Sequence, residues 1–218
     1  MLLLGGEHEE TLESIDMLAT VYWLDGRWEE AETLQVQVME TNKTKLGEDH
    51  PDTLISKGSL ASTYMKQGRW EEAEKLQVQV VEKSKTKLGQ DHPSTLTYIV
   101  NLAATYRSQG RLKKAEELQV QVMETSKTNL GEDHPDTLTS MANLAFTWKS
   151  SALDAKAINL LRACLTKQKQ TLGPNHPTTS SSSRILLKWE IEATRETEGQ
   201  WETDEEWDTD EEWETDRE

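Results

Sequence analysis

The histidines of this chain are spaced with a fixed interval of 42 residues. They are His8, His50, His92, His134 and His176. Whole segments recur with the same interval: residues 47–88 and 89–130 align over their full length, and each has Asp-His-Pro near its start. The same frame extends to residues 5–46 and 131–172. A fixed period of this length is typical of repeat architectures, in which each copy packs on its neighbours.

Each copy predicts two helices. In residues 89–130, apolar side chains recur every three or four positions from Leu96 to Tyr106, and again from Leu112 to Val122. This spacing places them on one face of each helix. Gly110 can end the first helix in a left-handed conformation, and Pro93 suits its first turn. The copy at 131–172 is degenerate in its turn, where Ser-Ala-Leu replaces Gln-Gly-Arg.

A short segment, Leu-Gln-Val-Gln-Val, alternates as a strand does. It recurs at residues 34–38, 76–80 and 118–122. We interpret it as helical, because its five residues lie inside a helical pattern of about seventeen. The fold is therefore predicted to be all-α, a right-handed α-solenoid of about four helix pairs. Residues 173–198 are predicted to form a degenerate fifth copy or capping helix, because serines replace its apolar start.

The net charge of −16 is concentrated at the C-terminal end. Residues 1–188 hold 22 Lys or Arg against 25 Asp or Glu, whereas residues 189–218 hold 2 against 15. A second, acidic repeat occupies residues 199–218. Its hexads begin at Trp201, Trp207 and Trp213. A step of six residues rotates by about 240° on a helix, so these tryptophans share no face. Strong like charge predicts a disordered acidic tail.

The 42-residue copies resemble tetratricopeptide (TPR) repeats. The resemblance rests on Asn101-Leu102-Ala103, Tyr106 and Ala115, and on the turn at residues 68–74. With its Asp-His-Pro, the period is similar to that of kinesin light chains and of the arrays in fungal NLR-like receptors. The sequence shows neither the heptad region by which kinesin light chains join the motor nor a GxxxxGK[ST] loop. The resemblance thus implies a binding array over residues 5–172 rather than a motor subunit.

The resemblance also implies that the array is a protein-interaction scaffold, with an extended peptide bound in a concave groove. In the family's register the groove residues are Ser59, Met65, Lys66, Asn101, Arg107, Asn143, Phe146 and Lys149. Asn101 and Asn143 match a position whose amide pairs with the peptide backbone. The alternative is an asparagine hydrated on an exposed helix face. For the three cations, ordinary solvated surface charge is the alternative.

Two further functions are open for the acidic tail. Kinesin light chains bind peptides that carry Trp beside Asp or Glu, and Glu206-Trp207-Asp208 resembles such a peptide. This resemblance implies a self-regulated adaptor, whose tail occupies its own groove or links neighbouring chains. Alternatively, the tail binds basic partners by charge. A tail that only solubilises the chain is the simplest alternative.

No catalytic site, metal site or cofactor is predicted. Histidines in neighbouring copies should lie about 10 Å or more apart, too far to share one zinc ion, so we expect them to shape turns. Cys164 has no context that activates a thiolate, and the serines at 180–183 lack a nucleophile-elbow pattern.

A single cysteine fits a reducing, cytoplasmic compartment. The apolar start at residues 1–4 is too short to span a membrane, and no basic stripe predicts nucleic-acid binding.

Overall fold

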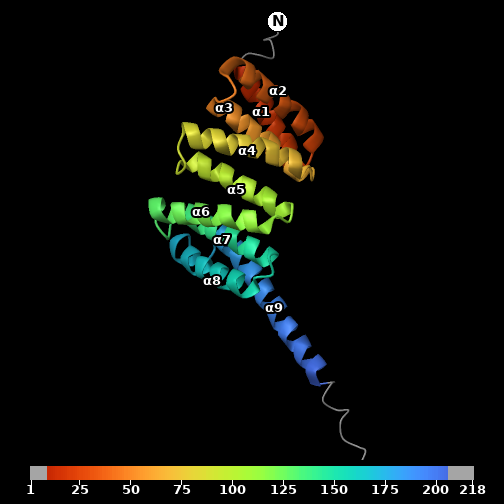
Figure 1. The fold of residues 1–218 in the computed structure, drawn as a ribbon, viewed down its shortest axis with the longest axis vertical. Coiled ribbons are helices and arrows are strands. Elements are labelled where there is room, and N and C mark those ends of the chain that lie inside the picture. Colours follow the sequence, from red (N-terminus) through yellow and green to blue (C-terminus); the bar gives the residue numbers. More distant parts are fainter. Residues whose placement is uncertain (1–8, 206–218) are drawn as a thin grey trace, which may run out of the picture. The chain divides into compact units, whose positions relative to one another are not determined.

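The computed structural model describes the backbone of residues 9–205 and the side-chain surroundings of residues 11–195. Within these limits the chain consists of α-helices joined by short turns (Figure 1). The helices are α1 (Glu9–Leu24), α2 (Trp28–Leu46), α3 (Pro51–Lys66), α4 (Trp70–Lys87), α5 (Pro93–Ser108), α6 (Leu112–Leu130), α7 (Pro135–Ser150), α8 (Asp154–Thr171) and α9 (Pro177–Glu205). The all-α prediction is confirmed, and the Leu-Gln-Val-Gln-Val segments lie inside α2, α4 and α6.

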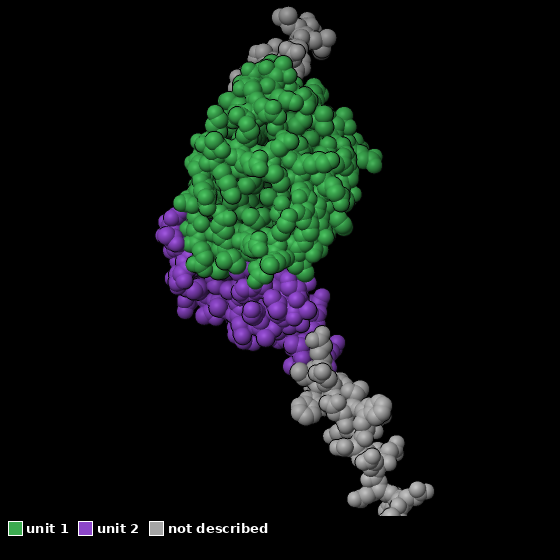
Figure 2. Space-filling view, in the orientation of Figure 1, with its two compact units in different colours: residues 1–125 green, residues 126–218 purple. Residues whose placement is uncertain are grey.

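The helices form consecutive antiparallel pairs, each of which corresponds to one 42-residue copy. The chain divides into two compact units, residues 1–125 and residues 126–218 (Figure 2). Unit 1 contains α1 to α5 and most of α6, and unit 2 contains the end of α6 and α7 to α9. In unit 1, α2 packs on α3 and α4 packs on α5, so each pair also contacts the next pair. Among the described residues, no helix is long and apolar enough to cross a membrane.

Four of the histidines cap the helix that follows them, which confirms the expected role in turns. Nδ1 of His50, His92, His134 and His176 accepts the backbone N–H of the residue two positions later, at 3.2–3.3 Å. An N-cap acceptor of this kind satisfies one of the amide groups that the first helical turn leaves without a partner. The proline that follows each of these histidines suits the first helical position, which needs no amide hydrogen. His8 lies outside the described residues.

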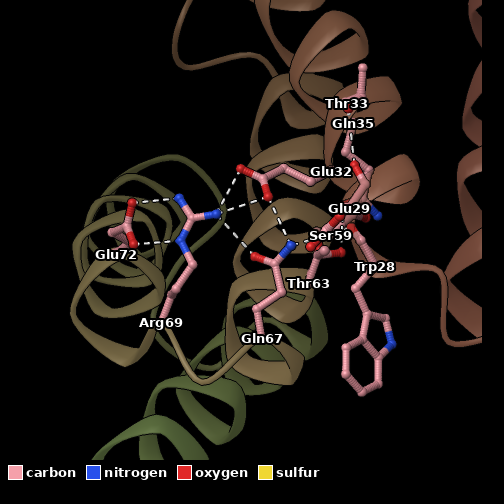
Figure 3. A network of polar contacts seen from close by, with 10 residues as sticks. All are labelled: Trp28, Glu29, Glu32, Thr33, Gln35, Ser59, Thr63, Gln67, Arg69 and Glu72. Atoms are coloured by element: carbon pink, nitrogen blue, oxygen red, sulfur yellow. Dashed lines mark hydrogen bonds and ion pairs between the residues drawn. The ribbon is translucent and has the colours of Figure 1, made fainter.

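Arg69 joins neighbouring helix pairs of unit 1 through the polar network drawn in Figure 3. Its guanidinium lies 2.8 Å from Glu32 of α2 and 2.6 Å from Glu72 of α4. Gln67 donates to the same Glu32 carboxylate at 2.8 Å. One copy later the contacts recur, because Arg111 lies 2.6 Å from Glu74. These contacts set the register of one pair on the next.

A buried hydrogen bond supports the same register inside unit 1. The Thr63 hydroxyl donates to Gln35 at 2.6 Å, and the Thr105 hydroxyl donates to Gln77 at 2.5 Å. These four side chains are almost fully buried. Each bond joins the first helix of one pair to the second helix of the preceding pair, so it satisfies polar groups that would otherwise be buried without a partner.

The terminal helix α9 packs on α8 through apolar contacts instead. Leu161 and Trp189 stand, in the 42-residue frame, where the earlier pairs have Gln and Thr. Both belong to the core of unit 2, together with Ile158, Leu165 and Leu186. The predicted terminal helix is therefore present, and an apolar pair replaces the polar one at its interface with α8.

Helix α9 runs further than the expected boundary at Gly199. It continues to Glu205, so Trp201 lies within a helical backbone. Trp207 and Trp213 lie outside the described residues, and the expectation for residues 206–218 stays a prediction from sequence.

Candidate peptide-binding surface

A cavity of about 310 Å³ opens between α3 and α5 of unit 1. It is lined by Ile55, Gly58, Ser59, Ser62, Ser94, Thr97, Tyr98 and Asn101. Two of the predicted groove residues, Ser59 and Asn101, thus line one cavity. These two residues occupy equivalent positions in successive copies, so the stacking of the repeats brings them to the same cavity.

The lining of this cavity is uncharged and rich in small side chains. Ser62 and Thr97 donate their hydroxyl hydrogens to backbone carbonyls four residues earlier, at 3.0 Å, so their oxygens retain capacity to accept. Asn101 is half-buried, and its backbone carbonyl lies 3.2 Å from the Thr105 hydroxyl oxygen. The Asn101 amide can both donate to and accept from an extended peptide backbone.

Tyr98 shapes one wall of the cavity, and we did not single it out from the sequence. Its ring edge would lie 3.4 Å from a Cβ added at Gly58, so the glycine leaves room for the ring. Burial raises the pKa of the Tyr98 phenol. The signal was present in the repeat, because Tyr98 stands where other copies have serine and Gly58 stands where the next two have Val100 and Ala142. Two contacting residues that both differ from their equivalents in the other copies indicate a local change in packing.

A second and larger cavity, of about 620 Å³, lies between α1, α2 and the start of α3. Ile55 lines both cavities and is 53% exposed. The two cavities of unit 1 are therefore adjacent, and a bound chain that occupies one of them can extend to the other.

The other predicted groove residues of unit 1 lie outside the lining of the α3–α5 cavity. The Met65 sulfur lies 3.0 Å from the Thr105 hydroxyl oxygen, so Met65 contributes to packing between α3 and α5. Lys66 is exposed, with its ammonium 5.2 Å from the centre of the Trp23 ring, a cation–π contact. Arg107 is half-buried, and burial lowers the pKa of its guanidinium.

In unit 2, helix α9 engages two of the three predicted groove residues. The Phe146 ring meets the Trp189 ring edge-on, with centroids 5.3 Å apart. The Lys149 ammonium lies 3.0 Å from Asp154 and 3.5 Å from Glu192. Burial by itself lowers the pKa of Lys149, but the two carboxylates outweigh burial and raise it. The third predicted residue, Asn143, is half-buried on α7.

The Cys164 side chain packs inside unit 2. Cys164 is fully buried, its thiol donates to the Leu138 carbonyl at 3.1 Å, and burial raises its pKa to about 11. A thiol with a raised pKa is a poor nucleophile. Within the part of the chain that the structure describes, no three His, Cys, Asp or Glu side chains come together as a metal site.

Comparison with known families identifies the repeats. A tetratricopeptide repeat model matches residues 11–82, 52–128 and 98–150, and a second tetratricopeptide repeat model matches residues 137–178. No curated protein matches the chain.

Solved structures share the arrangement of helices. The nearly identical TPR-like repeats of a proposed kinesin light chain from Podospora anserina match with a TM-score of 0.73 and 31% identity, over 89% of this chain and 92% of that chain. BtubC (BKLC) from P. vanneervenii matches with a TM-score of 0.65 and 18% identity, over 96% and 85% of the two chains. The apo form of RapI matches with a TM-score of 0.66 and 12% identity, over 88% and 73%. The last two show the fold alone. The matched models and the Podospora repeats together establish that this chain belongs to the tetratricopeptide repeat family, with repeats of the kinesin light chain type.

Proposed function

We propose that this interaction scaffold binds an extended peptide across the first helices of the pairs in unit 1, with the α3–α5 cavity as the main subsite. The observation that carries the proposal is the joint placement of Ser59 and Asn101 in one exposed, uncharged cavity. A volume of about 310 Å³ lies at the lower end of the range for ligand pockets. Such a cavity suits one side chain and the adjoining backbone of a peptide.

In this proposal Asn101 holds the peptide backbone in unit 1. Asn143 is the equivalent residue on α7, and we propose the same role for it within unit 2. The walls around Asn101 offer hydroxyl groups but no charge, so hydrogen bonds and shape determine the fit there. Lys66 and Arg107 contribute positive charge elsewhere in unit 1. Lys149 contributes little, because Asp154 and Glu192 already neutralise its charge.

The test begins with random peptides displayed on phage and selected against the full chain. Peptides that bind would be synthesised with a fluorophore and titrated by fluorescence anisotropy into the parent protein and into Asn101→Ala. We expect the substitution to weaken binding about tenfold, which corresponds to the loss of one or two buried hydrogen bonds. Asn159→Ala is the matched control, because Asn159 lies on α8 and accepts from Arg162 on the same helix. Equal affinity for Asn101→Ala and the parent would reject the cavity as the binding site.

The structure makes the acidic tail a weaker candidate for this surface. Of the three cations that would receive its carboxylates, Lys149 is already paired with Glu192 of α9. A synthetic peptide of residues 199–218 is therefore a useful second probe. We expect it to bind far more weakly than the selected peptides.

A further inference from the structure

We propose that the cavity between α1, α2 and α3 receives a Lys or Arg side chain of the bound peptide. The inference rests on the proposed peptide-binding function, and it names the chemistry of one peptide position. The cavity's volume of about 620 Å³ lies well within the range of ligand pockets. It is lined by Leu12, Glu13, Asp16, Val38, Asn42, Lys45, Leu46, His50, Asp52, Ile55 and Ser56.

The apolar part of the lining suits the methylene stem of a long basic side chain. Leu12 and Val38 are buried at its floor, and Leu46 and Ile55 are exposed at its edge. Lys and Arg side chains commonly place their carbon stems along such surfaces while their charged ends reach polar groups.

The charged part of the lining favours a cation. Glu13 and Asp16 come from α1 and Asp52 comes from the first turn of α3, against the single ammonium of Lys45. Burial raises the pKa of the Asp16 carboxyl, which is the expected effect of partial removal from water. A bound ammonium or guanidinium would offset that cost, because an opposite charge nearby favours the ionised carboxylate.

In the next copy of the repeat the equivalent cavity is smaller and uncharged. There Gly58 takes the position of Asp16, and Tyr98 takes the position of Ser56. The Tyr98 ring lies against Gly58, and the equivalent cavity between α3 and α5 has about 310 Å³ instead of about 620 Å³. The first copy therefore combines a small residue, which leaves the space open, with a carboxylate that faces it.

The position of the cavity fits a peptide that also occupies the α3–α5 cavity. Ile55 lines both, and packed helices lie about 10 Å apart. An extended chain advances about 3.3 Å per residue, so about three residues would separate the basic side chain from the residue beside Asn101.

The experiment transplants the second copy's pair into the first. Random peptides on phage are selected in parallel against the full chain and against the double variant Asp16→Gly/Ser56→Tyr. The parent should enrich Lys or Arg at one fixed peptide position, and the double variant should still select peptides but without that preference. Circular dichroism would confirm that the variant folds, as the Gly58–Tyr98 pair leads us to expect. Asp16→Asn, which keeps the shape and removes the charge, is the companion variant.

Fluorescence anisotropy then quantifies the preference. Replacing the enriched Lys with norleucine should weaken binding to the parent about tenfold, and should change binding to either variant by less than about twofold. Peptides without a basic preference, or a preference that persists in the double variant, would overturn this inference while leaving the proposed function intact. Failure to select any peptide would reject both proposals.

Discussion

Ala152 adopts a left-handed backbone conformation in the turn between α7 and α8. Its φ is 55°, and it stands where the earlier turns have glycine, as at Gly110 with a φ of 73°. The hydrogen bonds of the turn are preserved, since the Leu153 amide donates to the Trp148 carbonyl at 2.9 Å as Arg111 does to Tyr106 at 2.8 Å. The two flanking helices therefore impose the turn geometry whatever residue stands there.

The substitution Ala152→Gly should stabilise the protein. A left-handed conformation costs an L-residue about 1–2 kcal/mol, and the extra freedom that glycine brings to the unfolded chain offsets about 0.4–1 kcal/mol of that gain. We expect a net increase of about 0.5–1 kcal/mol in the free energy of unfolding, measured by urea titration. Gly110→Ala is the matched control and should destabilise. A lower stability of Ala152→Gly would show that the methyl group makes a favourable contact.

At the scale of a helix, each histidine N-cap ties the Asp-His-Pro turn to the helix that follows. His92→Ala leaves the Ser94 amide without its acceptor. The expected loss is about 1 kcal/mol of unfolding free energy, the usual effect of removing a capping side chain. His92→Asn should recover most of the loss, because asparagine is a strong N-cap residue. If alanine and asparagine have the same effect, the imidazole stabilises the turn by packing and not by capping.

The sequence predicted the helices well because their signals are local. Apolar spacing, Pro at the first turn and Gly at the end are signals within one copy. The apolar spacing recurs in all four copies, and Pro and Gly each recur in three of them. The contacts that determine which groove residues are available are not local. Glu192 lies 43 positions beyond Lys149 in the sequence, and only the packing of α9 brings them together. The same holds for Trp189 beside Phe146.

The α3–α5 cavity was predictable in part. The family's register pointed to Ser59 and Asn101, and the structure places both in its lining. Tyr98 was missed because helical spacing alone assigns it no role. Met65 lies outside this lining, with its sulfur 3.0 Å from the Thr105 hydroxyl oxygen, and its place in the groove stays a prediction.

At the scale of the whole molecule, paired carboxylates make stability depend on pH. Hydrogen bonds with lysine or arginine lower the pKa of several carboxyl groups in both units. They are Glu48 with Lys57, Asp49 with Lys83, Glu72 with Arg69, and Glu132 with Lys127. A carboxyl whose pKa is lower in the folded state stabilises it above the unfolded pKa of about 4, and this contribution is lost as pH falls. Asp16 acts in the opposite direction, because its pKa is raised.

The paired groups outnumber Asp16, so we expect the melting temperature to fall as pH is lowered from about 6 to about 3.5.

Lys57→Met tests one pair without disturbing the packing. Lys57 is 3% exposed, and Ile99 and Met141 occupy the equivalent position in the next two copies. A methionine at position 57 should leave the free energy of unfolding near neutral pH unchanged or higher. Its apolar contacts in the buried site offset the loss of the ion pair with Glu48. The pKa of Glu48 should then return toward its ordinary value, so that the fall in melting temperature becomes shallower. An unchanged pH dependence in Lys57→Met, measured by thermal melts across this range, would show that the Glu48–Lys57 pair contributes nothing to acid sensitivity.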